Sequence, residues 1–161
     1  MDLWLLRHAA AEDRARSGRD SDRALTDEGR LQARSAAEAL RRLDPEVDQV
    51  WTSPYRRARE TAAAAAAVLE LEEKLRETAT LEPSADPEHV LEELRGRGAR
   101  GAVLVGHQPH LGLLLGRLLT GGKERELPLK KAGIAWLRWD GGDTAELRAL
   151  IPPRVRERLG G

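Results

Sequence analysis

Short apolar runs alternate along the chain with longer segments in which apolar residues recur at helical spacing. Uniformly apolar runs predict buried strands, and alternating apolar and polar positions predict strands with one exposed face. On these patterns we expect strands over residues 2–6, 47–53, 74–81, 101–107, 133–139 and 144–151. Helical spacing predicts helices over residues 26–42, 54–69, 86–95 and 109–119, and a loop over residues 120–131.

Residue types at the predicted helix ends agree with two of these assignments. Thr26 is suited to cap the helix 26–42, whose apolar stripe is predicted to comprise Leu31, Ala36, Ala37 and Leu40. Ser53 followed by Pro54 predicts an N-cap and a proline at the first helical position. The alanine-rich helix that follows is therefore expected to start directly after the strand 47–53.

The alternation of strands and helices predicts an α/β fold. The order β-α-β-α-β-α-β-α-β-β is typical of a three-layer α/β/α sandwich with a mostly parallel, mixed central sheet. No internal repeat and no long linker interrupts the pattern. We therefore expect one domain over residues 1–161.

Polar side chains follow three of the predicted strands at the point where each strand ends. Arg7 and His8 end the first strand, Ser53 and several arginines follow the second, and His107 ends the glycine-bounded strand 101–107. In open α/β sheets, ligands bind beyond the carboxyl ends of the strands. These three segments, which are far apart in the sequence, are therefore expected to meet at one edge of the sheet.

Composition excludes several classes of function and location. Lys and Arg together number 27 and so do Asp and Glu, which argues against a chain built to coat nucleic acid or an anionic membrane. The absence of cysteine excludes disulfides, thiol nucleophiles and cysteine-based metal sites. No apolar run reaches the length of a membrane span, and the N-terminus lacks the features of a signal peptide. A cytoplasmic location is expected.

Histidines and arginines gathered at helix N-termini predict a site for a phosphate group. The planar guanidinium group pairs bidentately with phosphate, and helix N-termini add backbone donors. The chain has no nucleotide-binding glycine loop, so side chains are expected to bind the phosphate without a metal or other cofactor. A neutral imidazole can attack phosphorus, and neighbouring guanidinium charges keep it neutral and stabilise the transferring phosphoryl group.

Four segments carry a resemblance to a known family. The chain contains "LLRHA", "DRALTDEGRLQA", "TSPYRRARETA" and "VLVGHQPHL", and together these resemble the histidine phosphatase superfamily, which has the phosphoglycerate mutase-like fold. The short chain and the "RHA" start are similar to the SixA-type phosphohistidine phosphatases. The matching segments extend from residue 3 to about residue 120 and are specific in combination rather than singly.

The resemblance implies roles for individual residues. His8 corresponds to the nucleophile that becomes phosphohistidine, Arg7 to a phosphate clamp, and His107 to a histidine that donates to a phosphate oxygen. The pattern S-P-x-x-R-A makes Arg57 the second clamp. Helical periodicity alone leaves Arg57 and Arg59 as alternatives, because both flank the buried stripe of the helix.

The chain also departs from the superfamily pattern. Ala9 stands where glycine is usual and Ala24 where proline is common. Mutases and many phosphomonoesterases use a glutamate to protonate the leaving oxygen, and here only Glu77 and Glu82 are candidates, without the full motif. SixA-type members generally lack this acid. A phosphoimidazole bond needs less acid assistance than an ester, so the incomplete motif favours phosphohistidine as the substrate.

The leading hypothesis is a metal-independent phosphatase that forms a phosphohistidine at His8 and dephosphorylates phosphohistidine on a partner protein. One alternative is a phosphatase of small phosphorylated metabolites with Glu82 as its general acid. Another is a non-catalytic phosphate-binding module. No nucleic acid or membrane partner is expected.

Other chemically capable residues have simpler interpretations. His110 is interpreted as a packing or surface residue and His89 as a solvated one, and zinc at His107 and His110 is disfavoured because no carboxylate or thiol cluster accompanies them. The arginine-rich loop between Ala11 and Thr26 is interpreted as a charged, solvated loop, since acidic residues alternate with Arg14, Arg16, Arg19 and Arg23. The four tryptophans are assigned to packing.

Overall fold

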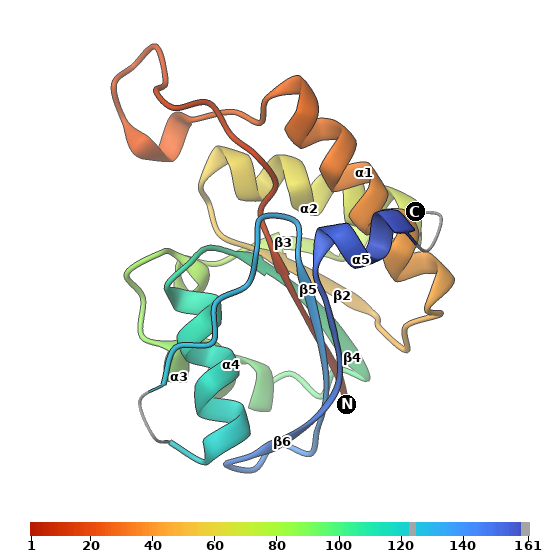
Figure 1. Ribbon diagram of the computed structural model, residues 1–161. Helices are drawn as coiled ribbons and strands as arrows, with labels where there is room; N and C mark the ends of the chain where they lie inside the picture. The colour runs from red at the N-terminus through yellow and green to blue at the C-terminus, as the bar shows by residue number, and fades with distance from the viewer. Residues whose placement is uncertain (123–124, 159–161) are drawn as a thin grey trace.

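A six-stranded mixed sheet forms the centre of the computed structural model, which describes residues 1–122 and 125–158 (Figure 1). Its strands are β1 (Asp2–Arg7), β2 (Gln49–Thr52), β3 (Leu75–Glu77), β4 (Gly101–Gly106), β5 (Ile134–Trp139) and β6 (Ala145–Ile151). They lie in the spatial order β3-β2-β4-β1-β5-β6. The strands β3, β2, β4 and β1 are parallel, whereas β5 and β6 are antiparallel to their neighbours.

Helices cover both faces of this sheet. They are α1 (Asp27–Arg42), α2 (Arg56–Leu69), α3 (Pro87–Arg95), α4 (His110–Thr120) and α5 (Pro153–Arg158). Figure 1 shows α1, α2 and α5 on one face and α3 and α4 on the other. The predicted three-layer α/β/α sandwich with a mostly parallel sheet is confirmed.

Each face of the sheet contributes to a separate apolar core. Leu3 and Leu5 of β1 pack toward α3 and α4, whereas Trp4 and Leu6 pack toward the alanines of α1 and α2. Successive side chains of a strand point to opposite faces, so a strand that is buried on both sides has a continuous apolar run. Trp4 stacks on Trp136 with ring centroids 4.7 Å apart, and Trp51 and Trp139 are buried, as the packing assignment predicted.

Thr26 caps α1 as predicted, because its side chain accepts a hydrogen bond from the Gly29 N–H at 3.0 Å. The predicted N-cap at Ser53 is wrong: α2 begins at Arg56, and its N-cap is Tyr55. Leu31 is also misassigned, since it is 71% exposed while Ala33 takes its expected place in the buried stripe.

Two further elements differ from the pattern-based prediction. The strand expected over residues 74–81 is reduced to the three residues of β3, which are followed by a 3₁₀ turn at Ala79–Leu81. The short helix α5 was not predicted at all. Within the loop predicted over residues 120–131, residues 123 and 124 lie outside the described residues, and residues 125–131 form no helix or strand. Among the described residues, no helix combines the length and apolar composition needed to cross a membrane.

The first turn of α1 lies directly against the segment that follows β1. A methyl group on Gly29 would overlap the backbone carbonyl of Ala10, which also accepts the N–H of Thr26 at 3.1 Å. Because this contact is with backbone, no side-chain rotation relieves it. Only glycine therefore allows α1 to start so close to the residues after His8.

We expect Gly29→Ala to lower the free energy of unfolding by about 1–3 kcal/mol, because backbone must move to admit the methyl group. The matched control is Gly96→Ala at the end of α3, where the nearest atom to the new methyl lies 3.7 Å away. That change should stay within about 1 kcal/mol of the original protein. Denaturant unfolding monitored by tryptophan fluorescence measures both, and equal stabilities for the two variants would contradict the close contact.

His110 is fully buried at the start of α4, so its interpretation as a packing residue is confirmed. Burial lowers the pKa of its imidazole to about 4, against the opposing effects of the Asp86 carboxylate and the Thr80 backbone. A folded pKa below the unfolded one means that the unfolded chain binds a proton which the folded protein excludes. The stabilisation is complete above about pH 6.5 and is lost as the pH falls toward about 4.

We therefore expect His110→Leu to weaken the acid dependence of stability. Between about pH 6.5 and about pH 4, the slope of unfolding free energy against pH should fall by up to about 1.4 kcal/mol per pH unit, the value for one proton. Denaturant titrations at several pH values measure this slope. His89→Leu, at an exposed histidine on α3, controls for the loss of a histidine. An unchanged slope in His110→Leu would contradict a buried neutral imidazole.

Candidate active site

The order of the strands brings the three predicted segments together. The strands β2, β4 and β1 are neighbours, and their carboxyl ends deliver Ser53, His107 and His8 to one edge of the sheet. Backbone hydrogen bonds extend the pairing beyond the strands, since the His8 N–H donates to the Gly106 carbonyl at 2.9 Å. The Ser53 N–H similarly donates to the Val105 carbonyl at 3.1 Å. The site residues are thus held by the sheet itself.

The imidazole of His8 is oriented by its own backbone neighbour. Its Nδ1 lies 2.8 Å from the Ala9 carbonyl oxygen, which can only accept a hydrogen bond. Nδ1 therefore carries the proton, and Nε2 keeps its lone pair. The Nε–H of Arg57 donates to this Nε2 at 3.3 Å. The arrangement leaves a lone pair on Nε2 that is able to attack phosphorus, and it places a guanidinium beside the position that a phosphoryl group on this atom would occupy.

Both histidines of the pocket are held in the neutral state. Burial lowers the pKa of His8 to about 4; the Ala9 hydrogen bond acts in the opposite direction, and the charges of Arg57, Arg7 and Lys131 lower it further. Burial, followed by the effects of His8 and Arg57, lowers the pKa of His107 to about 2. A neutral His8 keeps its lone pair throughout the physiological pH range, as nucleophilic attack requires.

His107 lies next to His8, with ring centroids 5.0 Å apart. Its Nε2 is 2.8 Å from the hydroxyl oxygen of Ser53, and its ring meets the edge of Tyr55. Its Nδ1 is buried and has no hydrogen-bonding partner among the described residues. A buried polar atom without a partner costs free energy unless a ligand supplies one. His107 is thus suited to contact a bound phosphate.

Arg57 rather than Arg59 faces the pocket, which resolves the alternative that helical periodicity left open. Arg57 is 5% exposed, whereas Arg59 is exposed and its Nη1 lies 3.4 Å from a carboxylate oxygen of Glu77. The guanidinium of Arg57 is also held from the far side by Asp20. Its Nη1 donates to the Asp20 carbonyl at 2.8 Å, and its Nη2 pairs with the Asp20 carboxylate at 3.0 Å.

Arg7 borders the pocket from β1. Its Nη1 donates to the Leu129 carbonyl at 2.8 Å, and its Nε is buried without a partner among the described residues. Burial lowers the pKa of the guanidinium, and the Glu126 carboxylate opposes that effect. The cationic side chains of Arg7 and Arg57 therefore lie near His8, as the resemblance led us to expect.

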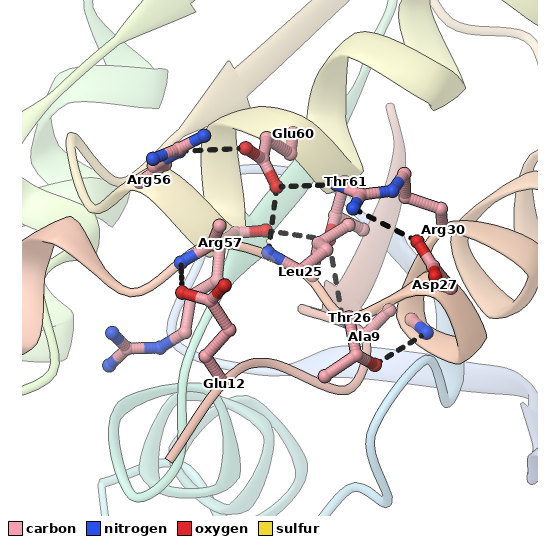
Figure 2. A network of polar contacts seen from close by, with 12 residues as sticks. Ala9, Glu12, Leu25, Thr26, Asp27, Arg30, Arg56, Arg57, Glu60 and Thr61 are labelled. Atoms are coloured by element: carbon pink, nitrogen blue, oxygen red, sulfur yellow. Dashed lines mark hydrogen bonds and ion pairs between the residues drawn. The ribbon is translucent and has the colours of Figure 1, made fainter. Parts of the chain in front are cut away.

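A set of polar contacts fastens the segment after His8 to α2 (Figure 2). The Thr61 hydroxyl accepts from the Ala9 N–H at 3.2 Å and donates to the Arg57 carbonyl at 2.8 Å. The Glu60 carboxylate accepts from the Leu25 N–H at 2.7 Å. The contacts of Thr61 thus hold the backbone next to His8 and the backbone of Arg57.

The two candidate acids lie in different surroundings. The carboxylate of Glu77 accepts a hydrogen bond from the exposed Arg59 rather than from a residue of the pocket. Glu82 lines a cavity of about 980 Å³ that Tyr55 also borders, together with residues of the loop 12–24. Within residues 1–122 and 125–158, no group of three His, Asp or Glu side chains is arranged to hold a metal ion.

Two residues of the site escaped prediction as functional residues. Asp20 lies in the loop that was interpreted as merely solvated; its ion pair with Arg57 binds that loop to the pocket. Thr61 lies inside the alanine helix, where it looks like ordinary packing. A threonine among alanines at a buried position was the available signal, since a buried hydroxyl needs hydrogen-bonding partners.

Comparison with known proteins agrees with this geometry. The family model of the histidine phosphatase superfamily (branch 1) matches residues 3–82. An uncharacterized protein of Picosynechococcus sp. is 39% identical over 154 residues, which cover 86% of this chain and 85% of that protein.

Solved structures give the same result. The protein histidine phosphatase SixA in complex with tungstate has a TM-score of 0.86 at 25% identity, covering 96% of this chain and 98% of its own. A Nakamurella multipartitia protein assigned as a SixA phosphohistidine phosphatase has a TM-score of 0.75 at 27% identity, covering 92% and 94%. The chain therefore belongs to the histidine phosphatase superfamily, resembles SixA within it, and is a phosphatase.

Proposed function

We propose that this phosphatase removes the phosphoryl group from phosphohistidine on a partner protein, through a metal-independent phosphohistidine intermediate on His8. The observation that carries the proposal is the orientation of His8. The Ala9 carbonyl holds the proton on Nδ1, and the guanidinium of Arg57 lies beside the free Nε2. Arg7, Arg57 and His107 bind the phosphoryl oxygens in this proposal.

The reaction proceeds in two displacements. In the first, the Nε2 lone pair of His8 attacks phosphorus, the bond between phosphorus and the substrate imidazole breaks, and that imidazole takes a proton from water. In the second, water attacks the phosphoryl group on His8, the P–Nε2 bond breaks, and inorganic phosphate leaves with the proton balance restored by solvent. The guanidinium groups stabilise the charge on the phosphoryl oxygens in both steps.

The carboxylates around the pocket support phosphohistidine as the substrate. Asp20, which contacts Arg57, has its pKa lowered by hydrogen bonds from Arg23 and Arg57, so it is ionised and cannot donate a proton. Glu77 is paired with Arg59. An imidazole leaving group requires less acid assistance than an alkoxide, so the P–N bond suits this set of groups.

The competing function is hydrolysis of small phosphomonoesters. One observation favours it, namely that Glu82 lines the cavity beside Tyr55, where an ester leaving group could lie. A glutamate that protonates an alkoxide contributes about 10²–10⁴-fold to the rate. Replacing Glu82 therefore distinguishes the two functions.

We expect His8→Ala to lower turnover of a phosphohistidine peptide and of p-nitrophenyl phosphate by at least about 10³-fold, since the attacking atom is lost. Glu82→Gln should leave hydrolysis of the peptide within about twofold of the original rate, because no acid is required for that bond. Phosphate release measured with and without chelator, alongside a panel of sugar and glycerate phosphates, tests both expectations.

Four results would contradict the proposal. Activity that survives His8→Ala would exclude a phosphohistidine intermediate on His8. A rate that falls when chelator is added would exclude a metal-independent mechanism. A rate loss of about 10²-fold or more in Glu82→Gln, together with preference for a small phosphomonoester, identifies the competing function. Phosphate binding without turnover of any substrate identifies a binding module.

Asp20 is proposed to position Arg57 rather than to react. Asp20→Ala should lower kcat by about tenfold with KM changed by less than about threefold, because the guanidinium loses the carboxylate contact to its Nη2 and keeps only the one from Nη1 to the backbone carbonyl. Asp20→Asn, which keeps an oxygen acceptor for Nη2, should recover part of kcat. Steady-state kinetics on the phosphohistidine peptide measure this split.

Asp22→Ala is the matched control for this prediction. Asp22 lies in the same turn, but its carboxylate is bonded to Ser17 and Arg19 within the loop and does not contact Arg57. If Asp22→Ala lowers kcat as strongly as Asp20→Ala, the order of the loop rather than the position of Arg57 determines the rate.

A further inference from the structure

A cationic hollow, separate from the cavity that Tyr55 borders, includes Arg7 of the site in its lining. It has a volume of about 640 Å³ and is lined by Arg7, Lys130, Lys131, Pro152, Pro153 and Arg154. No acidic residue lines it. The larger cavity beside Tyr55 differs, since it is lined by both basic and acidic side chains. The positive charge around the site is therefore concentrated on the Arg7 side.

The cations of this hollow are available to a ligand. Lys130, Lys131 and Arg154 are exposed, and none of their side chains has an ion pair or hydrogen bond with another residue in the part of the chain that the structure describes. The nearby carboxylate of Glu126 acts on Arg7, and it accepts a hydrogen bond from Gln108 at 2.9 Å. Unpaired cations grouped in one hollow attract anions more strongly than cations already paired at the surface.

The hollow is fixed to the catalytic residues by backbone bonds. The Ala132 N–H is shared between the carbonyls of Arg7 and His8, at 3.0 and 3.2 Å. On its other side, Ala132 accepts from Nη1 of Arg156 at 2.6 Å, and Nε of the same arginine donates to Ser35 at 3.0 Å. Arg156 is 3% exposed and belongs to α5. It thereby joins the two walls of the hollow, residues 130–132 and the start of α5.

We propose that this hollow is a second anion subsite, which binds acidic side chains flanking the phosphohistidine of a protein substrate. The inference rests on the proposed function and adds the substrate's charge pattern to it. Arg7 belongs to both sites, so an anion in the hollow lies on the same molecule as the phosphoryl group. The cations are exposed and come from two separate segments, an arrangement that suits several carboxylates on a protein surface better than one small ion.

The test uses two phosphohistidine peptides of equal length, prepared with phosphoramidate, in which the single histidine is flanked by glutamates or by glutamines. The original protein should hydrolyse the glutamate peptide with a kcat/KM about tenfold higher at low ionic strength, and salt should reduce the preference by screening. Lys130→Glu alone should reduce the preference, and Lys130→Glu combined with Arg154→Glu should remove it. Turnover of p-nitrophenyl phosphate should stay within about twofold, because that substrate carries no second anion.

Lys74→Glu is the matched control for Lys130→Glu. Lys74 is exposed and directly precedes β3, at the edge of the parallel sheet opposite the site. It should leave the peptide preference unchanged. Equal loss of preference in Lys74→Glu and Lys130→Glu would show a general effect of net charge and overturn the subsite. Thermal unfolding of each variant verifies that it is folded.

The remaining outcomes separate this inference from the proposed function. Equal hydrolysis of both peptides by the original protein overturns the subsite while the phosphohistidine activity stands. A preference for a small alkyl bisphosphate over its monophosphate that depends on Lys130, without any peptide preference, overturns it in favour of a small-molecule site. Failure to hydrolyse either peptide, with p-nitrophenyl phosphate still turned over, contradicts the proposed substrate itself.

Discussion

The hydroxyl of Thr61 fixes the relation between the two halves of the site. His8 follows β1 and Arg57 belongs to α2, so 49 positions of sequence separate two side chains that contact each other. Thr61 accepts from the backbone after His8 and donates to the backbone of Arg57, which ties both to one turn of α2 (Figure 2). The orientation of the guanidinium beside the imidazole depends on this short separation, and so does the part of the lowered His8 pKa that Arg57 adds to the effect of burial.

Burial and charge act in the same direction on the pocket histidines. Removal from water disfavours the imidazolium ion, and the neighbouring guanidinium groups disfavour it further. The Ala9 carbonyl then selects which nitrogen carries the remaining proton. The imidazole is thus able to act as a nucleophile without a separate base, and the same guanidinium groups lie where they can stabilise the charge of a phosphoryl group. One arrangement of cations both keeps the histidine neutral and prepares the site for an anion.

The parallel strands could be predicted from the sequence because they are short apolar runs. The polar residues could be assigned to one edge of the sheet because ligands bind beyond the carboxyl ends of the strands in open α/β sheets. The sequence could not show whether the Leu31 side chain is buried or exposed, because the buried face of α1 consists mostly of small alanines rather than large apolar residues. It also could not show that Asp20 reaches Arg57, since that pair forms only after the loop folds back on α2. Serine is a common N-cap residue, but the hydroxyl oxygen of Ser53 lies next to Nε2 of His107, and α2 begins only at Arg56.

Ala132 has a left-handed backbone conformation, with φ of 55°, and its N–H is shared by the carbonyls of Arg7 and His8. The segment that carries the two exposed lysines is therefore attached to the nucleophile through main chain alone. Side chains at those two positions can therefore change the charge beside the site, and Lys131 contributes to the pKa of His8, while the backbone that holds the reacting groups keeps its path. Substitutions at these two exposed positions are therefore expected to alter substrate preference more readily than the chemistry of the site.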